Sequence, residues 1–221
     1  MSASEAMDSG ADATISEELE RTMKRGVAEK DEASLLLVAI RDVAVVSALL
    51  SLFAAAEAWA TVSGLAFASL LATVDGFLVG AATTALAHEW GHFAGARLGG
   101  GHAPLKPLTG FLPLFDFDYA SDQANNEGRG FAWMSLGGNI AHVAVPLFYF
   151  FALPTNGPGT AALVGGAAGF AVFSSLVEWP VIARTREGMP GLKALGTIPR
   201  DFVPRYTPWA VGAAFLIFLV L

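Results

Sequence analysis

The chain contains no cysteine, and only 15% of its 221 residues are charged. Without cysteine, a disulfide framework and a thiolate-bound zinc site are both excluded. A soluble domain carries about a quarter charged residues, so the low charge content argues against a globular protein with a large core. The net charge is −7 and no basic patch stands out, so we expect no nucleic-acid partner.

What the chain has in abundance is apolar sequence, with 54% hydrophobic residues and a mean hydropathy of +0.53. This composition predicts an all-α polytopic membrane protein with about five transmembrane helices. The predicted spans are residues 34–62, 64–98, 131–153, 160–183 and 206–221. In the fourth span, Gly165 and Gly169 have the spacing that allows close packing of helices. The whole segment 34–221 is interpreted as one transmembrane domain.

Residues 1–33 are polar, with nine acidic and four basic side chains, and are predicted to form a cytosolic tail. Five Lys/Arg residues lie in 1–41, three in 97–130 and five in 184–205, and the other two connections contain none. Five spans with a cytosolic N-terminus place all thirteen on the cytosolic side, as the positive-inside rule requires. An additional span before residue 76 is the alternative, and it would separate the N-terminal basic residues from the others.

The connection of residues 99–130 is rich in glycine and proline and interrupts the helical pattern. Aromatic residues recur at every second position within 109–119, which is the period of a strand. We therefore expect a short strand-like segment at the membrane surface. The carboxylates of Asp116, Asp118 and Asp122 are expected to be solvated there.

The second span carries the sequence His88-Glu89-Trp90-Gly91-His92, an HExxH motif. On a helix, two histidines four residues apart share one face. They can take neighbouring corners of a tetrahedral zinc site, while Glu89 acts as the general base on a metal-bound water. Because the chain has only four histidines, a chance match is improbable.

A catalytic zinc needs a third protein ligand, and depth in the membrane indicates which residue it is. Counted from the cytosolic ends of their spans, the two histidines lie roughly 9–15 Å deep, Asn139 roughly 12 Å and Glu178 roughly 9 Å. Ionisable groups inside a membrane are costly and face the bundle interior. Glu178 is therefore the predicted third ligand, although a helix-end glutamate turned towards water is the alternative. His142 is a rival ligand, or else a hydrogen-bonded core histidine.

Asn139 follows two glycines, which indicates a point where helices approach closely. Its amide can donate to a carbonyl oxygen of a bound polypeptide, so it is a candidate substrate-binding residue. A hydrogen bond between helices is an equally good interpretation.

Together these features resemble the site-two protease family of intramembrane zinc metalloproteases. The HExxH of His88, Glu89 and His92 matches the family's first motif, and residues 137–139 (Gly-Gly-Asn) loosely resemble its second. The third motif of the family is Leu-Asp-Gly, whereas this chain has Val-Glu-Trp-Pro at 177–180. Glu187, followed by a glycine, is the nearest acidic-glycine pair and a second alternative ligand. The resemblance covers about residues 72–188.

The resemblance implies a peptidase that cuts membrane-embedded protein segments, as in regulated intramembrane proteolysis. The predicted protein binds one zinc ion per chain near the cytosolic face and acts on a membrane-spanning protein substrate within the lipid bilayer. The alternative is a non-proteolytic membrane protein with a structural metal site that binds a partner. A transporter is a further alternative, with Asp75, Glu89 and Glu178 as its proton path.

Overall fold

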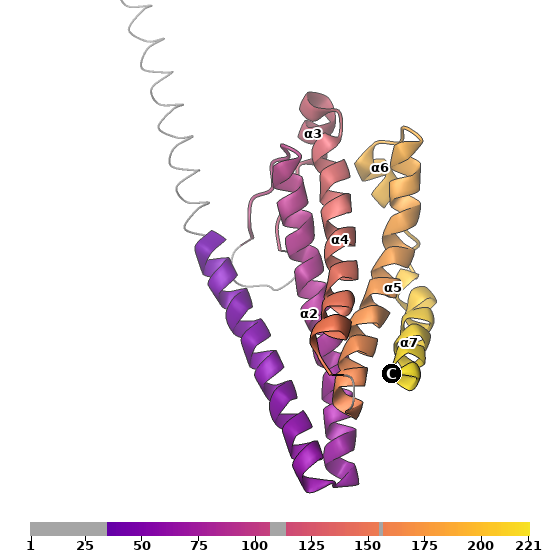
Figure 1. Ribbon diagram of the computed structural model, residues 1–221. Helices are drawn as coiled ribbons and strands as arrows, with labels where there is room; N and C mark the ends of the chain where they lie inside the picture. Colours follow the sequence, from indigo (N-terminus) through magenta and orange to yellow (C-terminus); the bar gives the residue numbers. More distant parts are fainter. Residues whose placement is uncertain (1–34, 107–113, 155–156) are drawn as a thin grey trace, which may run out of the picture. The chain divides into compact units, whose positions relative to one another are not determined.

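The computed structural model describes residues 35–106, 114–154 and 157–221. Within these residues, five helices are long and apolar enough to cross a membrane, and each lies within four residues of a predicted span at both ends. They are Leu35–Ser63, α2 (Ala66–Leu98), α4 (Arg129–Ala152), α5 (Pro158–Arg186) and α7 (Phe202–Val220) (Figure 1). The predicted all-α polytopic membrane fold is confirmed. The predicted tail, residues 1–33, falls outside the described residues.

The described parts of the connections contain two shorter helices, α3 (Tyr119–Asn126) before α4 and α6 (Gly191–Leu195) before α7. The chain divides into two units within its first long helix, Met1–Arg41 and Asp42–Leu221. In the first unit only residues 35–41 are described, and they are helical. The second unit contains every residue of the candidate site.

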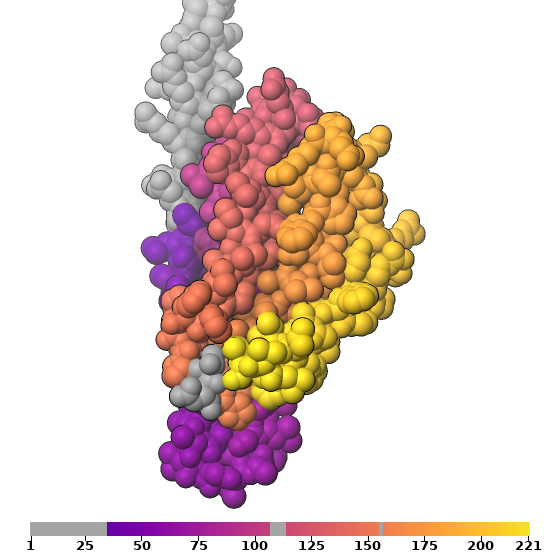
Figure 2. Space-filling model, turned by 45° about the vertical axis from the view of Figure 1, so that its right-hand side comes forward, coloured from indigo at the N-terminus to yellow at the C-terminus, as the bar shows by residue number. Residues whose placement is uncertain are grey.

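Helix α2 packs against both α4 and α5, and α5 packs in turn against α7. Figure 2 shows α4, α5 and α7 side by side on one face of the second unit. Because α2 contacts two other long helices, a side chain on one of its faces can meet residues from both. This arrangement is what allows a site to be assembled from α2, α4 and α5.

Small residues bring these helices close together. A β-carbon on Gly80 of α2 would overlap the backbone of α5. On the other side of α5, Gly165 and Gly169 lie against Ala210 and Ala214 of α7. The close packing predicted from the spacing of these two glycines is therefore confirmed. Without a hydrophobic driving force between helices in lipid, such contacts provide much of the attraction.

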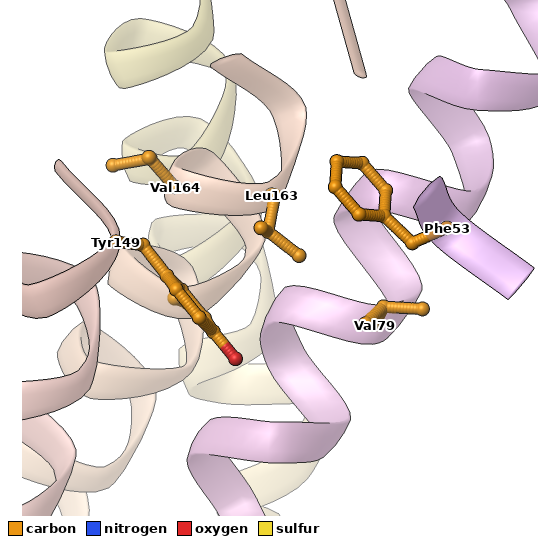
Figure 3. Close-up of a cluster of buried hydrophobic side chains, with 6 residues drawn as sticks. Phe53, Val79, Tyr149, Leu163 and Val164 are labelled. Atoms are coloured by element: carbon orange, nitrogen blue, oxygen red, sulfur yellow. The ribbon is translucent and has the colours of Figure 1, made fainter. Parts of the chain in front are cut away.

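A buried apolar cluster joins the four helices that surround it (Figure 3). Its labelled members are Phe53, Val79, Tyr149, Leu163 and Val164. The cluster includes one polar atom, the hydroxyl of Tyr149, which donates a hydrogen bond of 2.8 Å to Thr83 Oγ1 on α2. A buried hydroxyl without a partner would destabilise the fold, so this bond fixes the mutual placement of α2 and α4.

The first helix is held to the rest of the second unit at two levels. Trp90 of α2 donates from Nε1 to the buried carboxylate of Asp42, at 2.9 Å. Near the other end of the helix, Glu57 Oε2 accepts the backbone N–H of Gly159 in the first turn of α5, at 3.1 Å. A carboxylate at a helix N-terminus is favoured by the helix dipole. Trp90 lies inside the HExxH motif, so the first contact anchors the motif itself.

The strand predicted for residues 109–119 is not found in the described part of this segment. Residues 107–113 lie outside it, and the remainder forms a single antiparallel bridge between Leu105 and Phe115. From Tyr119 the chain turns into α3, because Asp118 accepts the N–H of Ser121 and caps that helix. The capping bond favours a helical start over continuation of the alternating pattern.

Asp122 is buried, and the expectation that it is solvated is wrong. Its two carboxylate oxygens accept the N–H groups of Gly130 and Phe131, at 3.0 and 2.9 Å. These donors belong to the first turn of α4, where the helix itself offers them no acceptor. Asp122 therefore caps α4 from the preceding helix and fixes where α4 begins.

Candidate metal centre

The HExxH helix presents its two histidines on one face, as their spacing predicts. The Nε2 atoms of His88 and His92 lie 3.0 Å apart. His88 is buried and His92 is partly buried. Both imidazoles contact α4 on one side and α5 on the other.

Glu178 of α5 meets both histidines. Its Oε1 lies 2.9 Å from Nε2 of His88 and 3.0 Å from Nε2 of His92. Within the described residues, these three form the one group of His, Asp or Glu side chains arranged to hold a metal ion. The structure therefore brings together the three residues that were predicted as ligands from the sequence, although Glu178 lies on a different helix from the two histidines.

The other nitrogen of each imidazole is held by a backbone carbonyl of α4. His88 Nδ1 lies 3.1 Å from the carbonyl oxygen of Gly138, and His92 Nδ1 lies 2.8 Å from that of Met134. A carbonyl can only accept, so the hydrogen bonds place a proton on Nδ1 of each ring. In a neutral imidazole this leaves Nε2 with a free lone pair. Metal-bound histidines in proteins are oriented by the same kind of contact.

Glycines make these hydrogen bonds possible. A β-carbon on Gly91 would overlap the carbonyl oxygen of Gly137, and one on Gly138 would overlap the imidazole of His92. The two histidines are four residues apart on α2, and the accepting carbonyls of Met134 and Gly138 are four residues apart on α4. The close approach of the two helices brings both pairs into register.

The donor set fits a zinc ion. A tetrahedral zinc with bonds of about 2.0–2.1 Å places neighbouring ligand atoms about 3.3 Å apart. The ligand atoms here are 2.9–3.0 Å apart, which is about 0.4 Å closer and requires only small side-chain adjustments. Three acceptor atoms facing one another repel unless a cation lies among them. Two imidazoles and a carboxylate also leave a fourth position open, as a catalytic zinc requires.

The open side of the group faces a cavity of about 370 Å³. Glu89, His92, Ser135 and Glu178 contribute polar groups to its lining, and Phe115, Phe117 and Tyr119 contribute aromatic ones. The cavity lies within the size range of small-ligand sites. Glu89, the predicted general base, therefore shares a cavity with two of the three candidate ligands.

The connecting segment contributes a backbone group to this cavity. Leu114 donates its N–H to Oε2 of Glu89, at 3.1 Å. The carboxylate of Glu89 thus already accepts from a peptide N–H, the group that a peptide substrate carries. At the start of α3, burial and the charge of Glu89 raise the pKa of Tyr119 above its ordinary value, so its hydroxyl stays protonated beside the cavity.

Asn139 lies next to Glu178 and also lines a cavity between α4 and α5. Its amide nitrogen donates to Glu178 Oε2 at 2.7 Å and to the carbonyl oxygen of Ser135 at 2.9 Å. Its side-chain oxygen accepts from Trp179 Nε1, at 2.9 Å. The structure thus contains the interhelical hydrogen bond that was one of the two interpretations of Asn139. Its substrate-binding role stays a prediction.

The two alternative ligands lie outside the group. His142 is completely buried, with Nδ1 at 3.1 Å from Nδ1 of His88 and Nε2 at 3.1 Å from Ser175 Oγ. Its contact is with Nδ1 of the candidate ligand His88, whereas Glu178 contacts the other ring nitrogen, Nε2. Glu187 is exposed at the C-terminal end of α5, nine residues or about 13 Å along the helix from Glu178. It lies at a second cavity, of about 730 Å³, between α4 and α5.

Several residues around the centre were not found by reasoning from the sequence. Ser174 Oγ lies 3.1 Å from His88 Nε2, and Ser175 contacts His142. They precede Glu178 by four and three residues, so helical periodicity places all three on one face. That spacing was an available signal. The role of Trp179 as a donor to Asn139 had no comparable signal, because it depends on the rotation of α4 relative to α5.

No family model, no curated protein and no solved structure matches this chain. Function is therefore inferred from the geometry of the site, and the resemblance to the site-two protease family stays a prediction.

Proposed function

We propose that this chain is an intramembrane zinc endopeptidase that cleaves membrane-embedded protein segments. One observation carries the proposal: Nε2 of His88, Nε2 of His92 and Oε1 of Glu178 converge within 3.0 Å, from two membrane-spanning helices. Polar groups of this kind are rare in membrane spans and mark functional sites by default. Here they form a complete three-ligand set with an open side.

His88, His92 and Glu178 would hold the ion, and the α4 carbonyls keep both histidines in the tautomer that binds it. The chemistry that zinc supplies when bound to such a set is Lewis acidity towards a peptide carbonyl and towards water. Glu89 lies at the same cavity. Its carboxylate takes a proton from the attacking water and delivers it to the nitrogen of the scissile peptide, which then leaves as an amine.

Glu89 is also the residue that favours an enzyme over a structural metal site. A structural zinc is normally enclosed by four protein ligands, whereas this group has three and faces a cavity of about 370 Å³. A carboxylate next to the open position has no use in a purely structural site. For a transporter, the two histidines and Glu178 would have to converge without a metal to bind.

The proposed substrate is a membrane-spanning polypeptide, because the site lies within helices that are apolar enough to cross a bilayer. The proposed orientation has a cytosolic N-terminus and the site near the cytosolic face. Support comes from the distribution of the Lys/Arg residues. Five of the thirteen precede the second unit. The other eight lie at the ends of α2, α4, α5 and α7 that are nearest the site, or in the connections between those ends. This distribution satisfies the positive-inside rule.

The direct test is metal content and peptide cleavage of the detergent-purified protein. We expect about one zinc per chain in the wild type and in Glu89→Gln, and none in Glu178→Ala. Glu187→Ala removes an exposed carboxylate from the same helix and serves as the matched control, with zinc retained. The cleavage probe is a synthetic peptide with one transmembrane segment interrupted by a Gly-Pro pair, reconstituted with the protein in liposomes.

Zinc-dependent cleavage by the wild type, and none by Glu89→Gln, would support the proposal. Equal zinc content in Glu178→Ala and wild type would contradict the assigned ligand set. Zinc in the wild type with no cleavage of several such peptides would instead favour the non-proteolytic alternative, a membrane protein with a structural metal site.

A further inference from the structure

His142 is a buried ionisable side chain that the proposed reaction does not use. It lies on α4, completely buried, and its two ring nitrogens contact α2 on one side and α5 on the other. Nδ1 is 3.1 Å from Nδ1 of His88, and Nε2 is 3.1 Å from the hydroxyl of Ser175. Both contacts are within hydrogen-bonding distance, so the protons on these four atoms have to be arranged consistently.

The arrangement is determined once His88 offers Nε2 to a metal ion. The proton of the neutral His88 ring then resides on Nδ1. That nitrogen faces the ring of His142, so Nδ1 of His142 must be the acceptor, because two N–H groups at 3.1 Å would repel. The proton of a neutral His142 ring is consequently on Nε2, where it donates to the oxygen of Ser175.

The carbonyl oxygen of Gly138 is the other acceptor for His88 Nδ1–H, also at 3.1 Å. In a continuous helix that carbonyl already accepts the backbone N–H four residues later, which belongs to His142. Within the described residues, the contact with His88 is the one hydrogen bond made by His142 Nδ1. Of the two acceptors for the Nδ1–H of His88, Nδ1 of His142 is therefore the one with no competing donor.

We propose that His142 is a positioning residue for the metal site. It accepts the Nδ1–H of His88 together with the Gly138 carbonyl, and so helps to hold that ring in the tautomer and orientation that present Nε2 to the ion. Ser175 in turn fixes the tautomer of His142. This inference rests on the metal site of the proposed function and does not depend on the proteolytic step.

The test compares zinc affinity, measured by competition with a chelator, among variants that keep or remove the acceptor. His142→Leu removes it, and we expect zinc affinity to fall about 10- to 100-fold, as with other groups that orient metal ligands. His142→Gln restores a side-chain oxygen that can accept the same proton, and we expect it to recover most of the affinity. His102, exposed in the connection after α2, provides the matched control, because His102→Gln should bind zinc like the wild type.

A second measurement reads the tautomers directly. The chain has only four histidines, so selective ¹⁵N labelling of histidine gives a resolvable spectrum of the detergent-solubilised, zinc-bound protein. We expect His88 to carry its proton on Nδ1 and His142 to carry its proton on Nε2. In His142→Leu, where the Gly138 carbonyl is the remaining acceptor, the zinc-free protein should show a larger share of the Nε2-protonated tautomer of His88 than the wild type.

Unchanged zinc affinity in His142→Leu would overturn the inference. Equal losses in the folded Leu and Gln variants would also overturn it, since they would indicate a packing role without the hydrogen bond. A proton on Nδ1 of His142 would contradict it as well. A wild type that binds no zinc would remove both this inference and the proposed function, whereas zinc binding without peptide cleavage would remove only the latter.

Discussion

Gly91 of α2 lies directly against the carbonyl oxygen of Gly137 on α4, with no room for a β-carbon between them. Gly91 is the third residue between His88 and His92, so the contact occurs inside the HExxH motif. It sets the distance between the two helix backbones at the level of the candidate metal centre. The hydrogen bonds from both histidines to the carbonyls of α4 depend on that distance.

Gly91→Ala is therefore expected to separate α2 from α4 and to abolish stoichiometric zinc binding, although every ligand is retained. The added β-carbon would overlap the Gly137 carbonyl oxygen, and neither backbone can move without breaking other helix contacts. Zinc content by mass spectrometry and the thermal midpoint in detergent measure the effect. Gly212→Ala on α7 is the control and should change neither value, because a β-carbon there meets no atom within 4 Å. Normal zinc content in Gly91→Ala would show that the close contact between α2 and α4 is dispensable.

Asn139 connects the candidate ligand Glu178 to Trp179 and to the backbone of α4. Asn139→Ala should raise the dissociation constant for zinc about 10-fold or more, because Glu178 Oε2 loses its 2.7 Å donor and the carboxylate is no longer oriented. Asn139→Asp should weaken binding further, since it places a second carboxylate beside the first. Chelator competition measures both. If Asn139→Ala binds zinc normally and only impairs peptide cleavage, Asn139 acts on the substrate instead of on Glu178.

Asp122 should matter for stability but not for the metal. In Asp122→Ala, two N–H groups at the start of α4 lose their acceptor, and the loss of such a cap destabilises a protein by about 0.5–2 kcal/mol. A lowered thermal midpoint with zinc content still at one per chain is the expected result. Asp116→Asn, at an exposed carboxylate paired with Lys106, should leave the midpoint nearly unchanged, because surface ion pairs contribute little. Equal midpoints in the two variants would argue against the capping role.

Zinc is expected to stabilise the folded protein, because it binds a site assembled from two helices that unfolding separates. At a free zinc concentration of about 100 times the dissociation constant, the gain is about 2.7 kcal/mol, which raises the thermal midpoint. The shift should be absent in His92→Ala, where one of the three ligands is missing, and should be reversed by a chelator in the wild type. A shift of equal size in His92→Ala would place the stabilising zinc elsewhere in the molecule.

The proposed orientation can be tested with single cysteines, because the chain has none of its own. Arg200→Cys, in the connection between α6 and α7, should react with a membrane-impermeant maleimide only from the cytosolic side. Ser63→Cys, at the end of the first helix, should react only from the opposite side. Both positions are exposed. Labelling of inside-out and right-side-out vesicles measures this, and reaction of both residues from one side would contradict five spans.

Local sequence patterns were sufficient to predict the five spans and the pair of histidines on one helix face. Hydropathy over about 20 residues is a property of each segment alone, and a spacing of four residues is enough to align two side chains on a helix. The choice of Glu178 needed one further step, a comparison of depths along separate helices. That comparison led to the residue that the structure places against both histidines, because membrane thickness gives all spans a common scale.

The tertiary structure decided what surrounds those three residues. The carbonyls of Gly138 and Met134, which orient His88 and His92, lie 50 and 42 residues away in the chain. Whether they reach the imidazoles depends on the separation and rotation of two helices, which no local pattern specifies. The same holds for Asn139 against Glu178, and for Asp122, whose loop position indicated solvent while its carboxylate caps a helix that begins seven residues later. The candidate ligand set follows from spacing and depth, whereas the orientation of each candidate ligand is a product of how closely the helices pack.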